Sequence, residues 1–210
     1  MSGFIQTLSY RTMESFNLRL FAWLNAPSHA SHLTLSLAYA LAIYAIYLVP
    51  LLMILGWLHR DPDRQRLALK ALLGCLAALS VNEVVTLLWD HPRPFAIPVG
   101  HTYLDHAANS SFPSDHMTVI STLAITLLLS REWRPLGYLS AGLGMGIAWA
   151  RVYLGVHFPL DMLGAIVVSA FVASLLAITE RFYMPTLHGL SRGLYRRLFA
   201  PLISRGWLAH

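Results

Sequence analysis

The sequence predicts an all-α, polytopic membrane helix bundle with five clear transmembrane helices plus an N-terminal interfacial helix. Of its 210 residues, 56% are hydrophobic and only 12% are charged, whereas soluble domains carry about a quarter charged residues. The mean hydropathy is +0.55. Long apolar runs recur, and a helix needs about 20 apolar residues to cross the hydrocarbon core. Strand alternation is absent, so the apolar runs are predicted to be helices.

Five apolar runs are the predicted transmembrane helices, and we expect the whole chain, 1–210, to be one membrane domain. The third and fourth runs are short, which fits a site that dips to the depth of the lipid headgroups. The runs cover residues 33–58, 67–89, 114–130, 136–150 and 160–179, and residues 180–210 form a basic tail. The single cysteine, Cys75, lies in the second run and excludes an intrachain disulfide.

The N-terminal segment, residues 1–32, is less apolar than the later runs. It has no basic region followed by an apolar core and a cleavage site, so a cleaved signal peptide is not expected. Arg19 and Asn17 fall on other faces of the predicted helix than its apolar residues. The apolar positions with helical spacing, which suit an interfacial amphipathic helix, are Phe16, Leu20, Trp23 and Leu24.

The basic residues predict the orientation of the chain in the membrane. The net charge is +5, yet no basic stripe with interleaved aromatic residues indicates nucleic-acid binding. Cytoplasmic loops carry an excess of Lys and Arg. The loops 90–113 and 151–159 should therefore lie outside and the C-terminus inside. The basic residues assigned to the cytoplasm are Arg60, Arg64, Arg66, Lys70, Arg131, Arg134, Arg181, Arg192, Arg196, Arg197 and Arg205.

Three clusters of polar residues fall on the predicted outer face. They are Arg93-Pro94-Phe95, the stretch 112–116 (Phe-Pro-Ser-Asp-His), and Arg151 followed by His157 and Asp161. Arginine binds phosphate oxygens through paired hydrogen bonds and stays charged. Phosphoryl transfer depends chiefly on positioning and on neutralising the charge of the equatorial oxygens. The clusters therefore suit a phosphate ester or anhydride that is handled without a metal ion.

The residues next to Ser114, His157 and Asp161 predict where each lies relative to a helix end. Ser114 follows a proline and precedes an apolar run, so it is predicted to be the N-cap of a helix whose free N–H groups can bind an anion. His157 should lie on a turn before the last helix, because Phe158-Pro159 begins that helix. Asp161 would then orient one ring nitrogen of His157 and free the other to attack phosphorus.

The three clusters resemble the type-2 phosphatidic acid phosphatase superfamily. Its motifs are Lys-x6-Arg-Pro, Pro-Ser-Gly-His and Ser-Arg-x5-His-x3-Asp, and their order and spacing match across residues 86–161. The sequence around these motifs is similar to that of the bacterial undecaprenyl-diphosphate phosphatases of the bacitracin-resistance type. The chain departs from the motifs at Thr86, Asp115 and Ala150, where the family has Lys, Gly and Ser.

The resemblance implies a site and a reaction. His157 would be the nucleophile that forms a phosphohistidine, Asp161 its orienting group and His116 the general acid. Arg93, Ser114, Asp115 through its backbone N–H, and Arg151 would bind phosphate, with no metal or other cofactor. The implied reaction is hydrolysis of undecaprenyl diphosphate to undecaprenyl phosphate at the periplasmic face of the bacterial inner membrane.

Other functions remain open at this stage. The substrate could be phosphatidylglycerophosphate or phosphatidic acid instead. The enzyme could also transfer the phosphate of the prenyl diphosphate to lipid A. A protein of a different class, a transporter or scaffold, would bind anionic headgroups without catalysis. Glu83 could assist the site or extend to the membrane surface. Gly142 and Gly146 are predicted to allow close helix packing. A zinc site is the weaker alternative for the four residues His91, His101, Asp105 and His106.

Overall fold

The computed structural model describes residues 2–59, 61–97 and 99–205, with side chains from residue 11 onward. The predicted basic residue Arg60 lies outside the described residues. Over the described part of the chain the regular structure is helical. The elements are α1 (Ser2–Leu24), α2 (His32–Tyr39), η1 (Ala40–Tyr44), η2 (Ala45–Tyr47), α3 (Leu48–Leu58), α4 (Pro62–Leu88), η3 (Pro94–Ala96), α5 (Asp115–Leu129), η4 (Arg131–Trp133), α6 (Arg134–Tyr153), α7 (Pro159–Leu198) and α8 (Ala200–Ser204).

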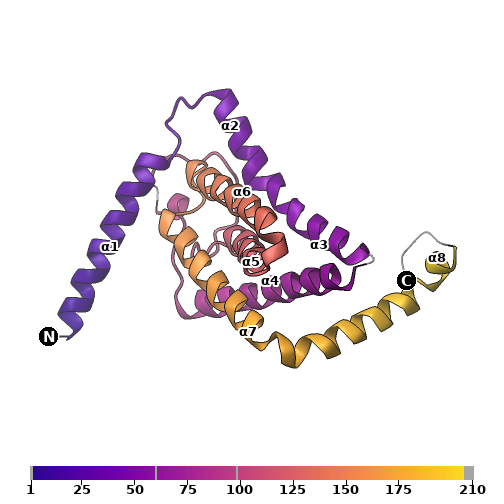
Figure 1. Cartoon of the computed structure of the whole chain (residues 1–210). Helices are drawn as coiled ribbons and strands as arrows, with labels where there is room; N and C mark the ends of the chain where they lie inside the picture. Colours follow the sequence, from indigo (N-terminus) through magenta and orange to yellow (C-terminus); the bar gives the residue numbers. More distant parts are fainter. Residues whose placement is uncertain (1, 60, 98, 206–210) are drawn as a thin grey trace.

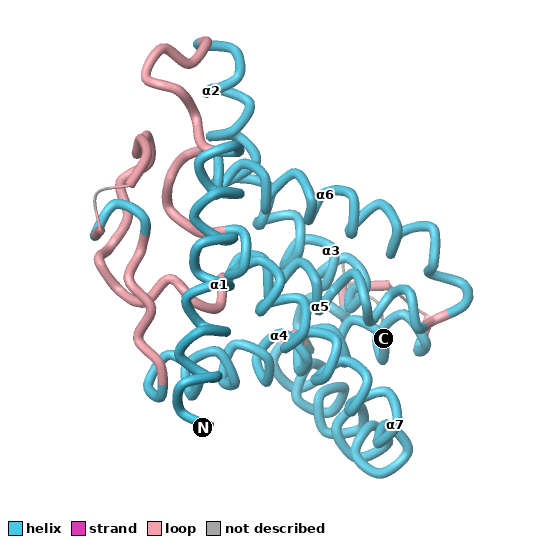
Figure 2. The backbone as a smooth tube through the Cα atoms, turned by 90° about the vertical axis from the view of Figure 1, so that its left-hand side faces the viewer, coloured by secondary structure: helices cyan, strands magenta, loops and turns pink. Residues whose placement is uncertain are grey.

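Each of the five predicted apolar runs is helical, and α5 lies at the centre of the bundle (Figures 1 and 2). It packs against α4, α6 and α7. Nine of its 15 residues are buried, so this helix meets protein rather than lipid around most of its circumference. By length and composition, three helices could cross a membrane: His32–Leu58, Pro62–Leu88 and Pro159–Leu198. These apolar helices make the chain an integral membrane protein, as the sequence predicted.

The first membrane helix is continuous in space but irregular in its middle. Residues Ala40–Tyr44 form a π-helix and Ala45–Tyr47 a 3-10 turn, between the α-helical segments α2 and α3. Irregular turns of this kind release backbone carbonyls from the helical ladder and often occur at functional sites. Here the carbonyl of Ala42 accepts a 3.4 Å hydrogen bond from Nη1 of Arg151, so the irregular segment helps to position a predicted site residue.

Glycines on α6 allow close packing, although the pair that does so differs from the prediction. A Cβ added at Gly144 would lie 3.3 Å from Ile120 of α5, and one at Gly137 would lie 2.8 Å from Leu128. A Cβ at Gly142 would meet no atom within 4 Å, and one at Gly146 would make ordinary contact with Leu41. The predicted Gly142–Gly146 pair is therefore wrong as the tight contact, because α6 faces α5 with residues 137 and 144.

Helix α1 contacts the bundle only near its C-terminal end, and its N-terminal part extends away from the other helices (Figure 1). Its buried residues there are Asn17 and Phe21, whereas the predicted apolar residues Phe16 and Trp23 are exposed. Asn17 Oδ1 accepts a hydrogen bond from the backbone N–H of Leu160. Phe16 and Trp23 of the predicted apolar face are therefore free for lipid, whereas Leu24 of the same face packs against the core.

Helix α7 is longer than the predicted fifth membrane run. It continues beyond residue 179 to Leu198, through Pro185, so much of the predicted tail 180–210 is helical. The extension packs against α3 and α4, where His188 contacts Gln65 at 3.3 Å and Trp57 through its ring. Glu180 of α7, which precedes Pro185, forms an ion pair of 2.7 Å with Lys70 of α4. These contacts hold the basic end of the chain against the bundle.

Candidate active site

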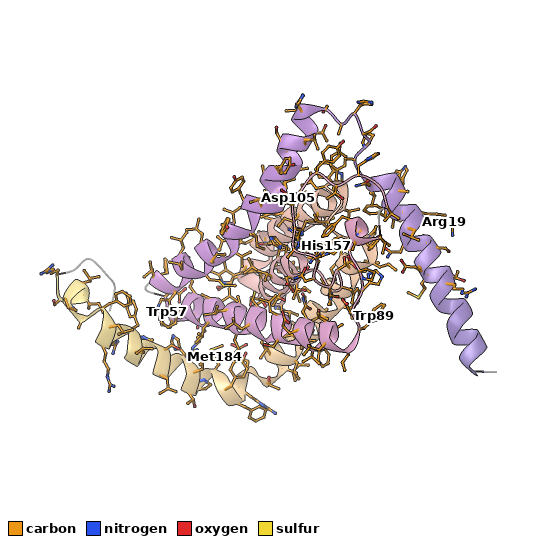
Figure 3. All side chains as sticks on the ribbon, turned by 180° about the vertical axis from the view of Figure 1, so that it is seen from behind. Arg19, Trp57, Trp89, Asp105, His157 and Met184 are labelled. Carbon is orange, nitrogen blue, oxygen red and sulfur yellow. The ribbon has the colours of Figure 1, made fainter. Side chains whose placement is uncertain are left out.

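Four helix ends meet at one end of the bundle and bring the three sequence clusters together. These are the C-terminal ends of α4 and α6 and the N-terminal ends of α5 and α7. In Figure 3, His157 and Trp89 lie on the side of the bundle that faces α1, and Trp57 and Met184 lie on the opposite side. The backbone N–H of Ser114 donates to the carbonyl of Asp161, at 3.3 Å. The N–H of Ser111 donates to the carbonyl of His91, at 2.7 Å.

His157 and Asp161 lie as their spacing predicted. His157 precedes α7, whose N-cap is Phe158 and whose first residue is Pro159. Its Nδ1 is 3.1 Å from Oδ2 of Asp161, and both side chains are buried. The backbone N–H of Phe158 donates to the same Oδ2 at 2.7 Å. Because the carboxylate accepts the hydrogen of Nδ1, Nε2 on the other side of the ring carries no hydrogen and keeps its lone pair.

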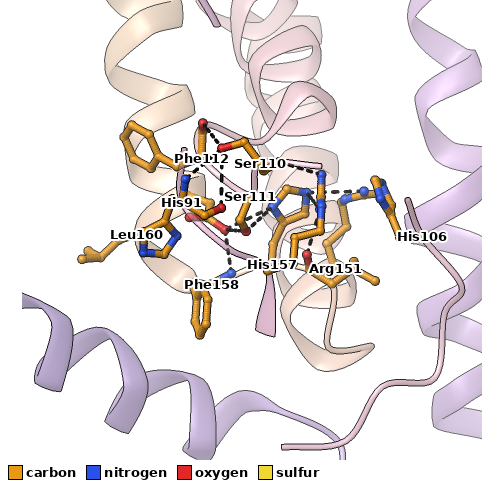
Figure 4. A network of polar contacts seen from close by, with 12 residues as sticks. His91, His106, Ser110, Ser111, Phe112, Arg151, His157, Phe158 and Leu160 are labelled. Atoms are coloured by element: carbon orange, nitrogen blue, oxygen red, sulfur yellow. Dashed lines mark hydrogen bonds and ion pairs between the residues drawn. The ribbon is translucent and has the colours of Figure 1, made fainter. Parts of the chain in front are cut away.

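Arg93 and Arg151 both point donors at that free nitrogen. Nη1 of Arg93 lies 3.1 Å from Nε2 of His157, and Nη2 of Arg151 lies 3.4 Å from it (Figure 4). Nε of Arg93 donates to Asn109, and Nη2 donates to the carbonyl of Ser110. Nε of Arg151 is buried without a hydrogen-bond partner among the described residues. Two guanidinium groups therefore converge where a phosphate oxygen would approach His157.

The electrostatics of the site favour a neutral, nucleophilic imidazole. Burial lowers the pKa of His157 well below its ordinary value, and the positive charges of Arg151 and Arg93 lower it further. The pKa of Arg93 is also lowered by burial, although Asp161 and Asp115 oppose that shift. His157 is thus unprotonated at neutral pH, as a nitrogen that attacks phosphorus must be.

The start of α5 has further groups of the kind that bind anions. Ser114 is the N-cap, as predicted, but its Oγ makes no capping hydrogen bond and is buried without a partner among the described residues. A buried hydroxyl is normally hydrogen-bonded, so this one is available to a ligand. The first free N–H groups of α5 and its positive dipole end lie beside it. His116 is half-buried in the first turn of the same helix.

Within the described part of the chain, the carboxylate of Asp115 neither caps a helix nor forms an ion pair with an arginine, the two interactions that would shield its charge from a bound anion. Its Oδ1 accepts a 2.8 Å hydrogen bond from Nδ2 of Asn82 on α4. The same Asn82 nitrogen donates to Oγ1 of Thr118, at 2.9 Å. The carboxylate is therefore fixed toward α4, while its backbone N–H remains at the helix start.

The histidine-rich loop does not gather into a metal site. His91 and His106 lie at opposite ends of the polar network (Figure 4), and His101 and Asp105 are exposed. Among residues 2–59, 61–97 and 99–205 no group of three His, Cys, Asp or Glu side chains is placed to hold a metal ion. The zinc alternative therefore has no support from this arrangement. His106 is nevertheless close to the site, with its ring centre 6.3 Å from that of His157.

Comparisons with known proteins agree with this arrangement. The model of the PAP2 superfamily matches residues 67–183. The chain belongs to the PAP2 superfamily. It is 38% identical to YbjG of Escherichia coli strain K12, which bears the name of a candidate undecaprenyl-diphosphatase, over 93% of this chain and 98% of that protein. It is 31% identical to the undecaprenyl-diphosphatase BcrC of Bacillus subtilis strain 168, over 76% and 81%.

Two solved structures share the fold of this chain. LpxE of Aquifex aeolicus superposes with a TM-score of 0.59 at 24% identity, over 76% of this chain and 93% of that one. A phosphatidylglycerolphosphate phosphatase of Bacillus subtilis gives a TM-score of 0.61 at 19% identity, over 83% and 88%. The family and the named relatives make the chain a PAP2-type lipid phosphatase, and the two solved structures agree with it in fold.

The three departures from the PAP2 motifs have distinct surroundings. Thr86, at the lysine position, donates through Oγ1 to the carbonyl of Phe112, at 3.3 Å, so this position braces the second motif. Ala150 is fully buried against α2. Asp115 is held by Asn82, as described above. The PAP2 site here consequently has one fewer lysine and one more carboxylate than its motifs prescribe.

Several PAP2-site residues were missed by the sequence analysis. Ser111 donates a 2.5 Å hydrogen bond from Oγ to Oδ2 of Asp161, and Asn109 and Ser110 hold Arg93. Asn82 was also missed, although a polar amide within an apolar run is a signal that could have found it. Glu83, its neighbour, is exposed on α4, so the alternative in which it assists the site gains no support.

Proposed function

We propose that this protein removes the terminal phosphate of undecaprenyl diphosphate, producing undecaprenyl phosphate and inorganic phosphate, through a phosphohistidine. The names of YbjG and BcrC, which match most of the chain, support this substrate. The observation that carries the proposal is the placement of His157, with Nδ1 on Asp161 and with Nε2 facing both Arg93 and Arg151.

In the first step, Nε2 of His157 attacks the terminal phosphorus. Arg93 and Arg151 transfer their hydrogen bonds from Nε2 to the equatorial phosphate oxygens, where negative charge is neutralised. The Oγ of Ser114 and the backbone N–H of Asp115 complete the anion site. The P–N bond forms as the anhydride P–O bond breaks, and undecaprenyl phosphate leaves with a proton supplied by His116.

In the second step, water hydrolyses the phosphohistidine. His116, now deprotonated, takes a proton from the water as its oxygen attacks phosphorus, and the P–N bond breaks to release phosphate. Asp161 keeps the Nδ1 hydrogen in place, so Nε2 is again the free nitrogen. No step in this scheme needs a metal ion, because two guanidinium groups and a helix terminus neutralise the phosphate charge.

The same proposal places the site at the periplasmic face of the bacterial inner membrane and the C-terminus in the cytoplasm. The basic residues at the Trp57 and Met184 end of the bundle support this orientation. They include Arg64 and Arg66 at the start of α4 and Arg192, Arg196 and Arg197 on the extension of α7. The prenyl chain would lie in the bilayer and present its diphosphate to the outer end of the helices.

The test is phosphate release by the purified full-length protein in detergent with EDTA. The substrates are undecaprenyl diphosphate, phosphatidylglycerophosphate and phosphatidic acid, with lipid A added as a possible phosphate acceptor. We expect undecaprenyl diphosphate to give the highest kcat/KM, and vanadate, which imitates the five-coordinate transition state, to inhibit. His157→Ala should abolish release and acid-labile labelling by terminally labelled substrate. His29→Ala, in the exposed loop before α2, is the matched control.

Three results would overturn the proposal. Activity that persists in His157→Ala would show that His157 is not the nucleophile. A higher kcat/KM for a phosphatidyl substrate than for undecaprenyl diphosphate would show that the proposed substrate is wrong. Transfer of phosphate to lipid A in preference to water would make the protein a phosphotransferase with the same nucleophile.

A further inference from the structure

His106 lies beside the ring of His157 although no motif contains it. Its ring centre is 6.3 Å from that of His157, and the two rings are inclined by 72°. In Figure 4 it stands beyond His157 and Arg151, at the end of the network opposite to His91 and Leu160. Because Asp161 occupies the Nδ1 side of His157, the reacting phosphate and its leaving group must lie on the Nε2 side, with the two arginines.

The loop that carries His106 is fixed on both sides of it. Before it, the backbone N–H of Tyr103 donates to the carbonyl of Leu154 at 3.0 Å, and the hydroxyl of Tyr103 donates to the carbonyl of Pro27 at 2.6 Å. After it, Asn109 is held by Nε of Arg93 through both its backbone and its side-chain oxygen. The position of the imidazole is therefore set by tertiary contacts rather than by chance in a long loop.

The charge requirement of a diphosphate leaves a place for such a group. The two arginines, Ser114 and the start of α5 serve the phosphate that is transferred. The phosphate that stays on the lipid also carries negative charge, and it gains more as the anhydride bond breaks. At the motif position of lysine the chain has Thr86, whose hydroxyl is turned to the carbonyl of Phe112. His106 is the donor that this arrangement offers to the second phosphate.

Building on the proposed function, we infer that His106 binds the second phosphate of a lipid diphosphate, the one that leaves with the prenyl chain, and thereby favours diphosphates over monophosphates.

The protonation of His106 fits this contact. Its Nδ1 lies 3.1 Å from the carbonyl of Ala107 and donates to it, so Nε2 is left for a ligand. Burial lowers the pKa of His106, and the charges of Arg93 and Arg151 lower it further, whereas Asp115 and the hydrogen bond to Ala107 raise it. A bound phosphate adds negative charge on the opposite side. Nε2 then takes up a proton and donates it as a charge-assisted hydrogen bond to a phosphate oxygen.

The experiment compares competitive inhibition by inorganic pyrophosphate and by inorganic phosphate in the full-length protein, in parallel with KM for undecaprenyl diphosphate. His106→Ala should raise the inhibition constant of pyrophosphate and the KM roughly tenfold, as expected for loss of one charge-assisted hydrogen bond. The inhibition constant of phosphate should change less than about twofold, because one phosphate fills the arginine site alone. His106→Gln, which keeps an amide donor, should recover part of the pyrophosphate affinity.

His101→Ala is the matched control, since His101 lies in the same loop with an exposed side chain; neither inhibition constant should change. Equal weakening of phosphate and pyrophosphate in His106→Ala would overturn the inference, since it would indicate a structural effect on the whole site. No weakening of either would overturn it as well. A wild-type protein that prefers a phosphatidyl substrate would instead overturn the proposed function, and the pyrophosphate comparison would still measure the role of His106.

Discussion

Asn82 donates a hydrogen bond of 2.8 Å from Nδ2 to Oδ1 of Asp115. The donor lies within an apolar helix and the acceptor at the start of α5, beside the proposed anion site. A neutral amide is well suited to this task, because it holds the carboxylate without adding a positive charge that would compete with the arginines for phosphate. The second bond of Asn82, to Thr118, fixes the orientation of the amide.

Removal of this amide should impair phosphate binding through Asp115. In Asn82→Leu the carboxylate is released to move toward the incoming anion, and we expect kcat/KM for undecaprenyl diphosphate to fall about tenfold, the loss of one hydrogen bond to a charged group. Asp115→Gly in the same chain should restore most of the activity, because it removes the released charge. A double-mutant cycle measures this coupling; losses that simply add would show that the amide acts independently of Asp115.

Ser111 should affect the rate rather than the binding of substrate. Its Oγ donates to Oδ2 of Asp161, the atom that also accepts from His157 and from the backbone N–H of Phe158. Ser111→Ala leaves the carboxylate with two donors in place of three, and one net hydrogen bond contributes about 1 kcal/mol. We expect kcat to fall roughly fivefold with KM nearly unchanged. Ser80→Ala is the control, because Ser80 is exposed and bonds only to Leu76 of its own helix.

The part of the site that could be predicted from the sequence is the part set by local backbone rules. Pro159 begins α7, Ser114 occupies the N-cap position of α5, and a separation of four residues brings Asp161 back to His157; each follows from helix geometry. Asn82 and His106 could not be found in this way. Their approach to Asp115 and His157 depends on how α4 and a long loop pack, which no short-range pattern determines.

The same distinction applies to the fold. The five apolar runs gave the helices of the bundle, because hydrophobic length is a local property. The contact between α1 and α7 was not predicted, because Asn17 accepts its hydrogen bond from the backbone N–H of Leu160, which is distant in sequence. The end of α7 was placed too early, because the polar residues after 179 resemble a tail until His188 and Tyr195 are packed against Trp57.

Gly164 should be necessary for the contact between the second and third motifs. A Cβ at this position would lie 2.3 Å from the ring of Phe112, which precedes Pro113 and Ser114. We expect Gly164→Ala to displace that ring and to lower the free energy of unfolding by about 1–3 kcal/mol, the usual cost of overpacking. Gly189→Ala, on the same helix with no atom within 4 Å of the added Cβ, should leave stability unchanged or raise it by up to about 1 kcal/mol. Thermal unfolding in detergent measures both, and equal stability of the two variants would contradict the prediction.

The proposed orientation can be measured by cysteine labelling in intact cells. The natural Cys75 is buried and provides a low background. A membrane-impermeant maleimide should label Asp105→Cys from the periplasm, and Arg196→Cys only after the inner membrane is opened. Both side chains are exposed; Asp105 lies in the loop beside the site, and Arg196 lies in the last turn of α7. The reverse labelling pattern would place the site in the cytoplasm and would exclude the proposed location.

The ring of His157 should remain neutral well below the pH at which an ordinary histidine gains its proton. Its pKa is lowered by burial and by Arg151 and Arg93, so the neutral form persists as the pH falls through 6.5, the ordinary value for this side chain. Nitrogen-15 NMR of the protein without substrate should show Nδ1 protonated and Nε2 unprotonated at pH 6, with His157→Ala used for assignment. Formation of the phosphohistidine in a single turnover should accordingly show no loss of nucleophile between pH 8 and pH 6. A ring that titrates at or above 6.5 would mean that the arginines and the burial do not act on His157 as the geometry requires, and the acid limb of the rate profile would then follow that titration.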